Sequence, residues 1–290
     1  MLGTEICRRL AAAGKSFRAL VRSTSDPVKK DVLKELGGEL VEGDLKDTSS
    51  LGRACQGVTA VITTPTAIGS QQEGDTFESV DLHGQMHLID AARAAKAGHY
   101  VFVSVSGNLL KRGENPLFDA KQAVENHLQR SGVTYTILRP TFFTEIWWSP
   151  HLGFDFANAK ATIYGSGQNK ISYISLHNVA DFAVKALSNP AARNAVLELG
   201  GPEALSQIEV VQMFEEIVGR AFEKQFIPEE ALRARKAAAT NPVEQAFADL
   251  TLAAARGDTI DMSETSQKFS VRLRSVRDYA KAVMSGIVAF

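Results

Sequence analysis

Three short apolar stretches of this chain end in residues that could hold a nucleotide. Arg22 closes the first stretch and Asp44 follows the second. The third ends in Thr63, Thr64 and Pro65. An arginine at such a place favours a ribose 2′-phosphate, because its guanidinium matches phosphate geometry. Plainer alternatives are a solvated strand end for the arginine, a helix-capping turn for the aspartate and turn chemistry for the last three.

A parallel sheet would bring these residues to one edge. The first half of the chain alternates short apolar runs with helical segments, which predicts parallel strands covered by helices on both faces. The predicted strands are 18–21, 39–43, 60–64, 100–104 and 135–138. The predicted helices are one after Gly3 and others at 27–36, 49–56, 81–97 and 117–130. Open sheets of this kind bind ligands outside the carboxyl ends of their strands.

The alternation fades after about residue 150. The elements predicted beyond it are strands at 171–175 and 196–199 and helices at 179–187, 231–255 and 275–284. We therefore expect an α/β chain with a Rossmann-type doubly wound parallel sheet over 1–150, to which 171–199 contributes. A smaller, mostly helical substrate domain is expected over 151–290.

Composition narrows the class of partner. The 290 residues carry a formal net charge of −1, which argues against nucleic acid and a membrane surface and leaves a small-molecule substrate. Cys7 and Cys55 have no metal or redox spacing and fit a reducing, cytoplasmic compartment. No apolar run reaches the roughly 18 residues that a membrane span needs. Charges at Glu5, Arg8 and Arg9 argue against a signal peptide.

The start of the chain raises a separate expectation. A helix followed by a strand is half of a βαβ unit, and the strand that should precede it is missing. Of the glycines that approach a pyrophosphate, only the last could be present, as Gly3. We expect Met1 to be an internal methionine of a longer chain, because a central strand contributes roughly 10 kcal/mol of burial. The alternative is that another segment or a partner chain fills the gap.

Several segments together resemble one family. They are "MLGTEICRRLAAAGKSFRALVR", "VEGDLKDTSSLGRACQGVTAVITTP", "FVSVSG", "DAKQAVENHLQRSGVTYTILRPTFF" and "LELGGPEALSQIEVVQMFEEIVGR". In order and spacing they are similar to the NmrA-like, isoflavone-reductase-like branch of the atypical short-chain dehydrogenases. The resemblance covers nearly the whole chain. It implies a bound NADPH rather than NADH, in line with Arg22. From the residues themselves, the Asp44 carboxylate could accept from the adenine amino group and Leu45 could pack on the adenine ring.

Lys121 is the candidate catalytic residue that the resemblance implies. Short-chain dehydrogenases commonly use a Tyr-x-x-x-Lys pair, whose lysine holds the nicotinamide ribose and lowers the pKa of the tyrosine. Here Leu117 stands at the tyrosine position, and the neighbouring Phe118 has no proton to give. Lys121 could keep the ribose contact or donate a proton itself. The plainer alternative is a helix-surface lysine paired with Glu125.

Residues after the fifth and sixth strands of the family pattern are expected near the nicotinamide and the substrate. Those expected to bind the cofactor are Ser104, Pro140, Thr141, Phe142 and Phe143. Those expected to line the substrate are Ser106, Phe118, Phe143, Trp147 and Trp148. An aromatic wall of this kind suits a planar quinone-like or enone-like substrate. The alternatives are a domain-interface core for the aromatic residues and buried or capping hydroxyls for the serines.

Two functions remain open. The first is an NADPH-dependent reductase of a small conjugated or carbonyl substrate. The second is a non-catalytic NAD(P)-binding redox sensor with a protein partner, which the missing tyrosine favours. A sugar-nucleotide epimerase is weaker, because that chemistry needs the tyrosine as its base. No metal is expected: His83 and His87 have a suitable spacing, but no third ligand is apparent.

Overall fold

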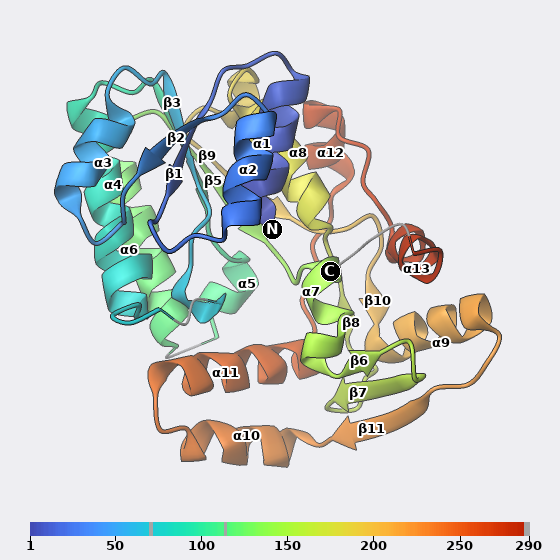
Figure 1. Ribbon diagram of the computed structural model, residues 1–290. Coiled ribbons are helices and arrows are strands. Elements are labelled where there is room, and N and C mark those ends of the chain that lie inside the picture. Colours follow the sequence, from blue (N-terminus) through green and yellow to red (C-terminus); the bar gives the residue numbers. More distant parts are fainter. Residues whose placement is uncertain (70–71, 113–114, 287–290) are drawn as a thin grey trace. The chain divides into compact units, whose positions relative to one another are not determined.

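A computed structural model describes residues 1–69, 72–112 and 115–286 (Figure 1). The chain forms two compact units, and each unit draws on separate segments of the sequence. Unit 1 comprises Met1–Val105, Leu117–Arg139 and Val179–Leu197. Unit 2 comprises Ser106–Pro116, Pro140–Asn178 and Glu198–Phe290.

Parallel strands form the centre of unit 1. They are β1 (Arg18–Val21), β2 (Glu39–Glu42), β3 (Ala60–Thr63), β4 (His99–Val103), β5 (Tyr135–Pro140) and β9 (Ala195–Leu199). β1 pairs with β2 in one sheet, and the other four strands form a second sheet in the order β3-β4-β5-β9. The register places Ala60 opposite His99 and Tyr100 opposite Tyr135. The predicted parallel sheet is confirmed.

Helices cover both faces of these sheets (Figure 1). They are α1 (Leu2–Ala12), α2 (Pro27–Glu35), α3 (Thr48–Cys55), η1 (Ala67–Gly69), η2 (Phe77–Gly84), α4 (Gln85–Ala94), α6 (Pro116–Arg130), α8 (Leu176–Ala186) and η4 (Pro190–Ala192). An ion pair between Arg9 and Asp181 joins α1 to α8 on one face. Another between Asp90 and His127 joins α4 to α6 on the opposite face. Burial from both sides explains why strand β4 is fully buried and, apart from His99, built from apolar and aromatic residues.

The helix predicted from Asp81 begins four residues earlier than its apolar pattern indicates. Its first eight residues form the π-helical turn η2, and the α-helix α4 follows directly. Thr76 caps the turn by accepting from the Ser79 backbone N–H, while the Ser79 hydroxyl accepts from the Thr76 backbone N–H. This reciprocal cap was not recognised because Ser79 stands where a glutamate or glutamine is usual. π-Helical turns are rare and are often found at functional sites.

Unit 2 contains helices and short strands. Its helices are α5 (Gly107–Leu110), α7 (Thr144–Trp147), η3 (Pro150–Leu152), α9 (Gln207–Val218), α10 (Glu229–Ala238), α11 (Pro242–Arg256), α12 (Ser263–Phe269) and α13 (Val276–Met284). Its strands are β6 (Phe154–Asp155), β7 (Lys160–Tyr164), β8 (Lys170–Ile171), β10 (Leu205–Ser206) and β11 (Glu223–Ile227). The strands pair in two sheets, β11-β7-β6 and β10-β8.

These bounds correct two predictions for unit 2 and add a strand that was not predicted. Of the strand expected at 171–175, only Ile171 lies in a strand, the two-residue β8. The helix expected at 231–255 is two helices, because Asn241 and Pro242 begin a new one with a side-chain cap and a proline in its first turn. Strand β11 was missed because its residues are polar and mostly exposed, so they lack the alternation of a half-buried strand.

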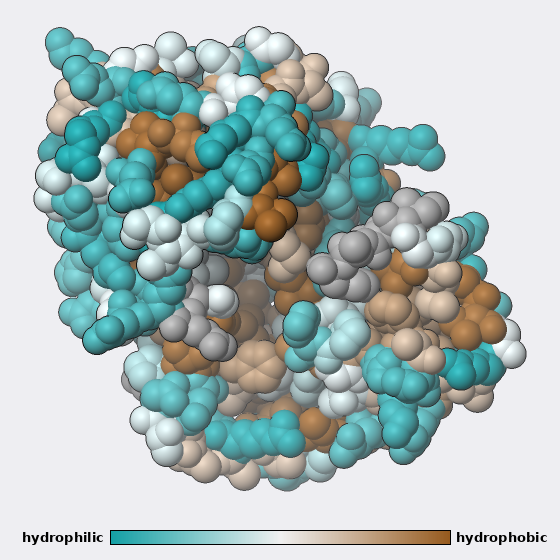
Figure 2. All heavy atoms as spheres, viewed as in Figure 1, coloured by the Kyte–Doolittle hydropathy of each residue, from teal (hydrophilic) through white to brown (hydrophobic). Residues whose placement is uncertain are grey.

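The surface is largely hydrophilic on the face that Figure 2 shows, and its apolar residues form separate patches. The more exposed large apolar side chains include Met1 and Val28. Scattered apolar residues of this kind are ordinary on a folded chain. None of the helices in the described part of the chain has the length and apolar character that crossing a membrane requires.

Candidate functional site

The carboxyl ends of strands β1 and β2 carry two cations on one buried carboxylate. Arg22 Nη1 donates to Asp75 Oδ2 at 2.6 Å, and Lys46 Nζ donates to Asp75 Oδ1 at 2.6 Å. The Asp75 side chain is 1% exposed, whereas those of Arg22 and Lys46 are 32% and 30% exposed. Arg22, the residue predicted to bind a 2′-phosphate, is therefore not a solitary solvated cation.

Asp44 and Leu45 lie beside this cluster. Asp44 Oδ1 accepts from the Lys46 backbone N–H at 2.8 Å, which makes a tight turn. The alternative in which Asp44 caps the next helix is wrong, because Asp47 is the cap of α3. Leu45 is buried at 7% exposure and its Cβ lies against Gly84. Contacts of either residue with adenine stay a prediction.

The end of strand β3 adjoins the start of helix α1. A Cβ added to Gly3 would lie 3.6 Å from Thr64 Oγ1, so this glycine brings the helix backbone close to the strand end. Thr63 points inward instead, and its hydroxyl donates to Gln85 Oε1 at 2.9 Å. The same glutamine donates to the Pro65 carbonyl at 3.4 Å. Gln85 thereby fixes the segment that follows β3.

Lys121 is buried against a carboxylate. Its Nζ lies 3.2 Å from Asp81 Oδ1 and 5.1 Å from the centroid of the Phe102 ring. The lysine and aspartate side chains are 5% and 0% exposed. Asp81 Oδ2 accepts from the Ala67 backbone N–H at 2.7 Å, so the aspartate also holds the segment after β3. The surface alternative for Lys121 is wrong: Glu125 pairs with Arg139 instead.

Unsatisfied polar atoms mark this same part of unit 1. Within the described residues, the Ser104 hydroxyl at the end of β4 is buried without a hydrogen-bond partner. Asp81 Oδ1 also lacks an aligned hydrogen bond, so its contact with Lys121 is purely ionic. Buried polar atoms are usually paired, and an orphaned one needs an explanation such as a missing ligand. A hydroxyl-bearing ligand at this edge would provide the missing partners.

Two polar residues predicted for the site, Ser106 and Thr141, bond to groups of unit 2 that were not predicted. Ser106 Oγ donates to Asp258 Oδ2 at 2.6 Å, and Asn108 donates to Asp258 Oδ1 at 2.8 Å. Thr141 donates its hydroxyl hydrogen to the Ser172 carbonyl. Burial lowers the pKa of Arg112, whereas the negative charge of Asp258 acts to raise that pKa. The serine predicted to touch substrate is thus bound to a carboxylate that the sequence did not single out.

The aromatic residues of unit 2 divide into buried and accessible members. Trp148 packs edge-on to Phe154 and Tyr173, with ring centroids 5.0 and 5.2 Å apart, and is 3% exposed. Phe142 is also 3% exposed and meets Trp147 edge-on at 4.7 Å. For Trp148 these contacts match the core alternative. The half-buried members are Phe143 and Trp147. Of the other expected residues, Pro140 ends β5 and is buried in unit 2, and Phe118 is buried in unit 1.

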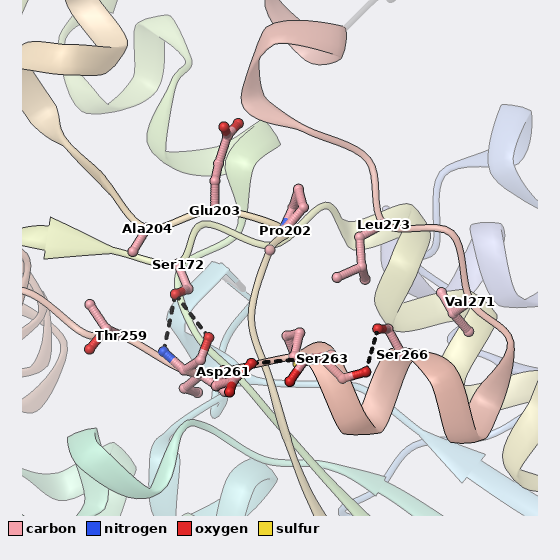
Figure 3. Close-up of a pocket in the computed structure, with 13 residues that line it drawn as sticks. Ser172, Pro202, Glu203, Ala204, Thr259, Asp261, Ser263, Ser266, Val271 and Leu273 are labelled. Atoms are coloured by element: carbon pink, nitrogen blue, oxygen red, sulfur yellow. Dashed lines mark hydrogen bonds between the residues drawn. The ribbon is translucent and has the colours of Figure 1, made fainter.

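Unit 2 contains a cavity of about 620 Å³ that none of the predicted residues lines. Its walls are Ser172, the turn 201–204 and part of the segment 259–273 (Figure 3). Ser172 Oγ accepts from the Ile260 backbone N–H and donates to its carbonyl. In Figure 3 the Glu203 carboxylate points away from the hydroxyl groups. The Ser172 hydroxyl in the cavity wall is therefore already hydrogen-bonded to the backbone.

Thiol and metal chemistry find little support. Burial raises the pKa of Cys7 to about 11 and also raises that of Cys55, so both thiols are protonated near neutral pH. The rings of His83 and His87 stack with centroids 6.4 Å apart. Across the described ranges, no group of three or more histidine, cysteine or acidic residues is placed to hold a metal ion.

Sequence reasoning missed Lys46, Asp75 and Asp81. Lys46 follows the Asp44 turn, and its charge was a signal that could have been weighed. Asp81 was placed at the start of a predicted helix, but nothing in the sequence aligned it with Lys121, which lies 40 positions further on. Asp75 precedes that helix in a polar stretch without a pattern. Only the fold brings these groups together.

The fold and strand-end residues define a Rossmann-type α/β protein. Residues 1–280 match the NmrA-like family, and the chain belongs to it. The predicted family resemblance is confirmed.

The similar proteins include one named as an assembly factor and others named as reductases or oxidoreductases. The chain is 32% identical over 232 residues to a photosystem II assembly factor, Ycf39, from Trieres chinensis, covering 78% of this chain and 69% of that protein. It is 30% identical over 246 residues to the isoflavone reductase homolog IRL from Zea mays, covering 80% and 75%. The NADPH-dependent quinone oxidoreductase QOR2 from Escherichia coli has a similar structure, with a TM-score of 0.76 at 20% identity over 98% of this chain and 96% of that one. That likeness confirms the fold.

Proposed function

We propose that this chain is an NADPH-dependent reductase of a small conjugated or carbonyl substrate, such as a quinone or an enone. The observation that carries the proposal is the buried Lys121–Asp81 pair at the carboxyl ends of β3 and β4. A desolvated ion pair costs free energy and is retained most readily where it has a task. Its surroundings, with an orphaned Ser104 hydroxyl nearby in unit 1, are those of a ligand edge.

The residues present fit a dinucleotide. Arg22 and Lys46 offer cations for a phosphate, and Gly3 leaves room beside Thr64 for a close approach of the backbone. The Ser104 hydroxyl lacks a partner among the described residues. The relatives support the choice of cofactor, since QOR2 is described as NADPH-dependent and a second QOR2 structure, with a TM-score of 0.74, as complexed with NADPH.

A few residues of this chain would have definite tasks in the proposed reduction. The nicotinamide of bound NADPH supplies a hydride to an electrophilic carbon of the substrate. Lys121 Nζ, paired with Asp81, would hold the hydroxyls of the nicotinamide ribose. Because Leu117 replaces the usual tyrosine, Lys121 Nζ also becomes the candidate donor of the proton that completes the reduction. Phe143 and Trp147, half-buried in unit 2, would contact a planar substrate.

A second candidate is a non-catalytic dinucleotide sensor that binds a protein. Two observations favour it: the buried Leu117 cannot serve as an acid, and the Ycf39 relative is named for assembly rather than for reduction. Such a protein would bind NADPH without consuming it. A cytoplasmic location stays a prediction under either function.

A binding and turnover experiment tests the proposal. Wild type, Lys121→Ala and the control Lys34→Ala, an exposed lysine of the same unit, are titrated with NADPH by fluorescence. Each is then mixed with NADPH and a panel of quinones and enones, and the loss of absorbance at the reduced nicotinamide band is followed. Wild type and the control should bind and turn over, and Lys121→Ala should lose at least about tenfold in one or both. Binding without turnover of any substrate would support the sensor instead.

A further inference from the structure

The Arg22–Asp75–Lys46 cluster, defined by those three residues, has an unusual layout for an ion-pair network. A single carboxylate receives both cations at 2.6 Å, one on each oxygen. The carboxylate is buried at 1% exposure, and each cation is about one-third exposed. A solute arriving from solvent would therefore meet the cations, with the carboxylate beneath them.

The local backbone holds Asp75 under the cations. Gly74 adopts the left-handed conformation with φ +77°, which turns the chain beneath the Lys46 ammonium. Thr76 follows as the cap of η2 and fixes the next residue. Lys46 also lies 3.4 Å from the Glu73 carbonyl, which its ammonium bonds. These contacts leave the Asp75 carboxylate little freedom to follow a ligand or to move aside for one.

The donor groups of the cluster suit a phosphate monoester. Asp44 Oδ2 lies 3.9 Å from Lys46 Nζ, so two carboxylates balance the two cations, and a phosphate would be held mainly by charge-assisted hydrogen bonds from the guanidinium and the ammonium. Without the Asp75 carboxylate, two like charges would repel each other and their long side chains would spread into solvent. With it, guanidinium and ammonium are preorganised side by side, and ordering them costs less free energy when a phosphate binds.

We propose that Asp75 is a specificity-determining residue, which acts by holding Arg22 and Lys46 together as a two-point anchor for the 2′-phosphate of the dinucleotide. The inference rests on the proposed use of NADPH, but it concerns phosphate recognition and not hydride transfer. Asp75 positions the anchor and does not itself touch the phosphate. The competing interpretation is that Asp75 occupies the phosphate site and must be displaced.

Adenosine 2′,5′-bisphosphate and adenosine 5′-monophosphate are the probes, because they differ only in the 2′-phosphate. Isothermal titration gives the ratio of their affinities for wild type, Asp75→Asn, Lys46→Gln and the control Asp31→Asn. Asp31 is an exposed carboxylate of α2, paired with Lys34. Circular dichroism melts verify that each variant is folded. If Asp75→Asn does not fold, the Lys46→Gln variant, altered at a part-exposed side chain, decides the outcome.

Wild type and the control should prefer the bisphosphate, and both Asp75→Asn and Lys46→Gln should lower that preference by about tenfold without weakening the monophosphate. An Asp75→Asn variant that prefers the bisphosphate more strongly shows displacement and overturns the inference. A wild type that does not prefer the bisphosphate also overturns the inference. A folded Lys46→Gln variant whose preference for the bisphosphate is undiminished overturns it as well. If the two variants lose the preference for the bisphosphate but the wild-type protein oxidises no NADPH, the inference is supported and only the proposed reductase activity is contradicted.

Discussion

At the scale of single residues, burial decides which group Lys121 pairs with. An ammonium that is 5% exposed must have a counter-charge, because the cost of desolvating it is several kcal/mol. Asp81 provides that charge, and the Phe102 ring adds a cation–π contact. The plainer alternative for Lys121 was an i, i+4 partner, Glu125, on its own helix. The actual partner comes from another element.

Removing one member of this pair should destabilise unit 1. Lys121→Met leaves a buried carboxylate without its cation and should lower the free energy of unfolding by about 3–5 kcal/mol. The double variant Lys121→Met with Asp81→Asn should recover part of that loss, because the amide keeps an acceptor for the Ala67 N–H without the charge. Urea unfolding measures all three proteins.

The control for this cycle is Lys34→Met, whose partner is an exposed aspartate. It should change the free energy of unfolding by less than about 1 kcal/mol. If Lys121→Met costs no more than this control, the buried pair contributes little and its proposed importance is wrong.

At the scale of elements, one segment serves both ends of the proposed cofactor site. Asp75 lies just before η2 and holds the two cations at the ends of β1 and β2, while Asp81 lies within η2 and holds Lys121. The π-helical turn therefore sets the spacing of the two carboxylates. Its end is tightly packed, because a Cβ on Gly84 would lie 2.8 Å from both Leu45 Cβ and the Ser79 carbonyl oxygen.

Gly84→Ala should disturb this element. The added methyl group would force Leu45 or the turn to shift and should cost about 1–3 kcal/mol of stability. Gly52→Ala is the matched control, since this glycine is also helical and has no heavy atom within 4 Å of an added Cβ. It should be neutral or stabilising by up to about 1 kcal/mol. Urea unfolding of both variants checks the difference, and equal effects would contradict the packing argument.

At the scale of the whole molecule, stability should depend on pH through a buried histidine. His99 is 5% exposed and its Nε2 lies 2.8 Å from Thr136 Oγ1, which donates its hydrogen to the Ala192 carbonyl. The threonine oxygen must then accept from the neutral imidazole. Burial lowers the pKa of His99, and the Arg193 charge lowers it further.

Because the folded protein binds this proton more weakly than the unfolded chain, its stability is fully present above the ordinary histidine pKa of about 6.5. It should fall as the pH drops from there through the lowered pKa. His99→Gln should flatten this part of the pH profile of the melting temperature, and His151→Gln, at an exposed histidine, should leave it unchanged. An unaltered profile in His99→Gln would show that another group governs the acid sensitivity.

The cofactor offers a second test on the whole molecule. A ligand that binds only the folded state stabilises it by about 2.7 kcal/mol at a concentration one hundred times its Kd. NADPH should raise the melting temperature at a concentration where NADH has a smaller effect, because Arg22 and Lys46 favour the additional phosphate. Equal shifts would contradict a preference for NADPH. A central strand ahead of Gly3 stays a prediction.

The sequence by itself determined the alternation of strands and helices in unit 1, the family, and most strand ends that carry polar residues. Local patterns are sufficient there, because burial on both faces demands apolar runs and parallel strands end at one edge. It did not determine the π-helical turn or the small strands of unit 2, whose residues lack a clear period.

Only the tertiary structure decided the partners of the charged residues. Asp75 lies 53 positions from Arg22, and Asp81 lies 40 positions from Lys121. An ion pair across such a separation forms because the fold brings the cation to a buried carboxylate that needs a counter-charge, and no local propensity encodes it. The sequence thus singled out Arg22 and Lys121 for a predicted ligand site, and the tertiary structure supplied Lys46 and the buried carboxylates that pair with these cations.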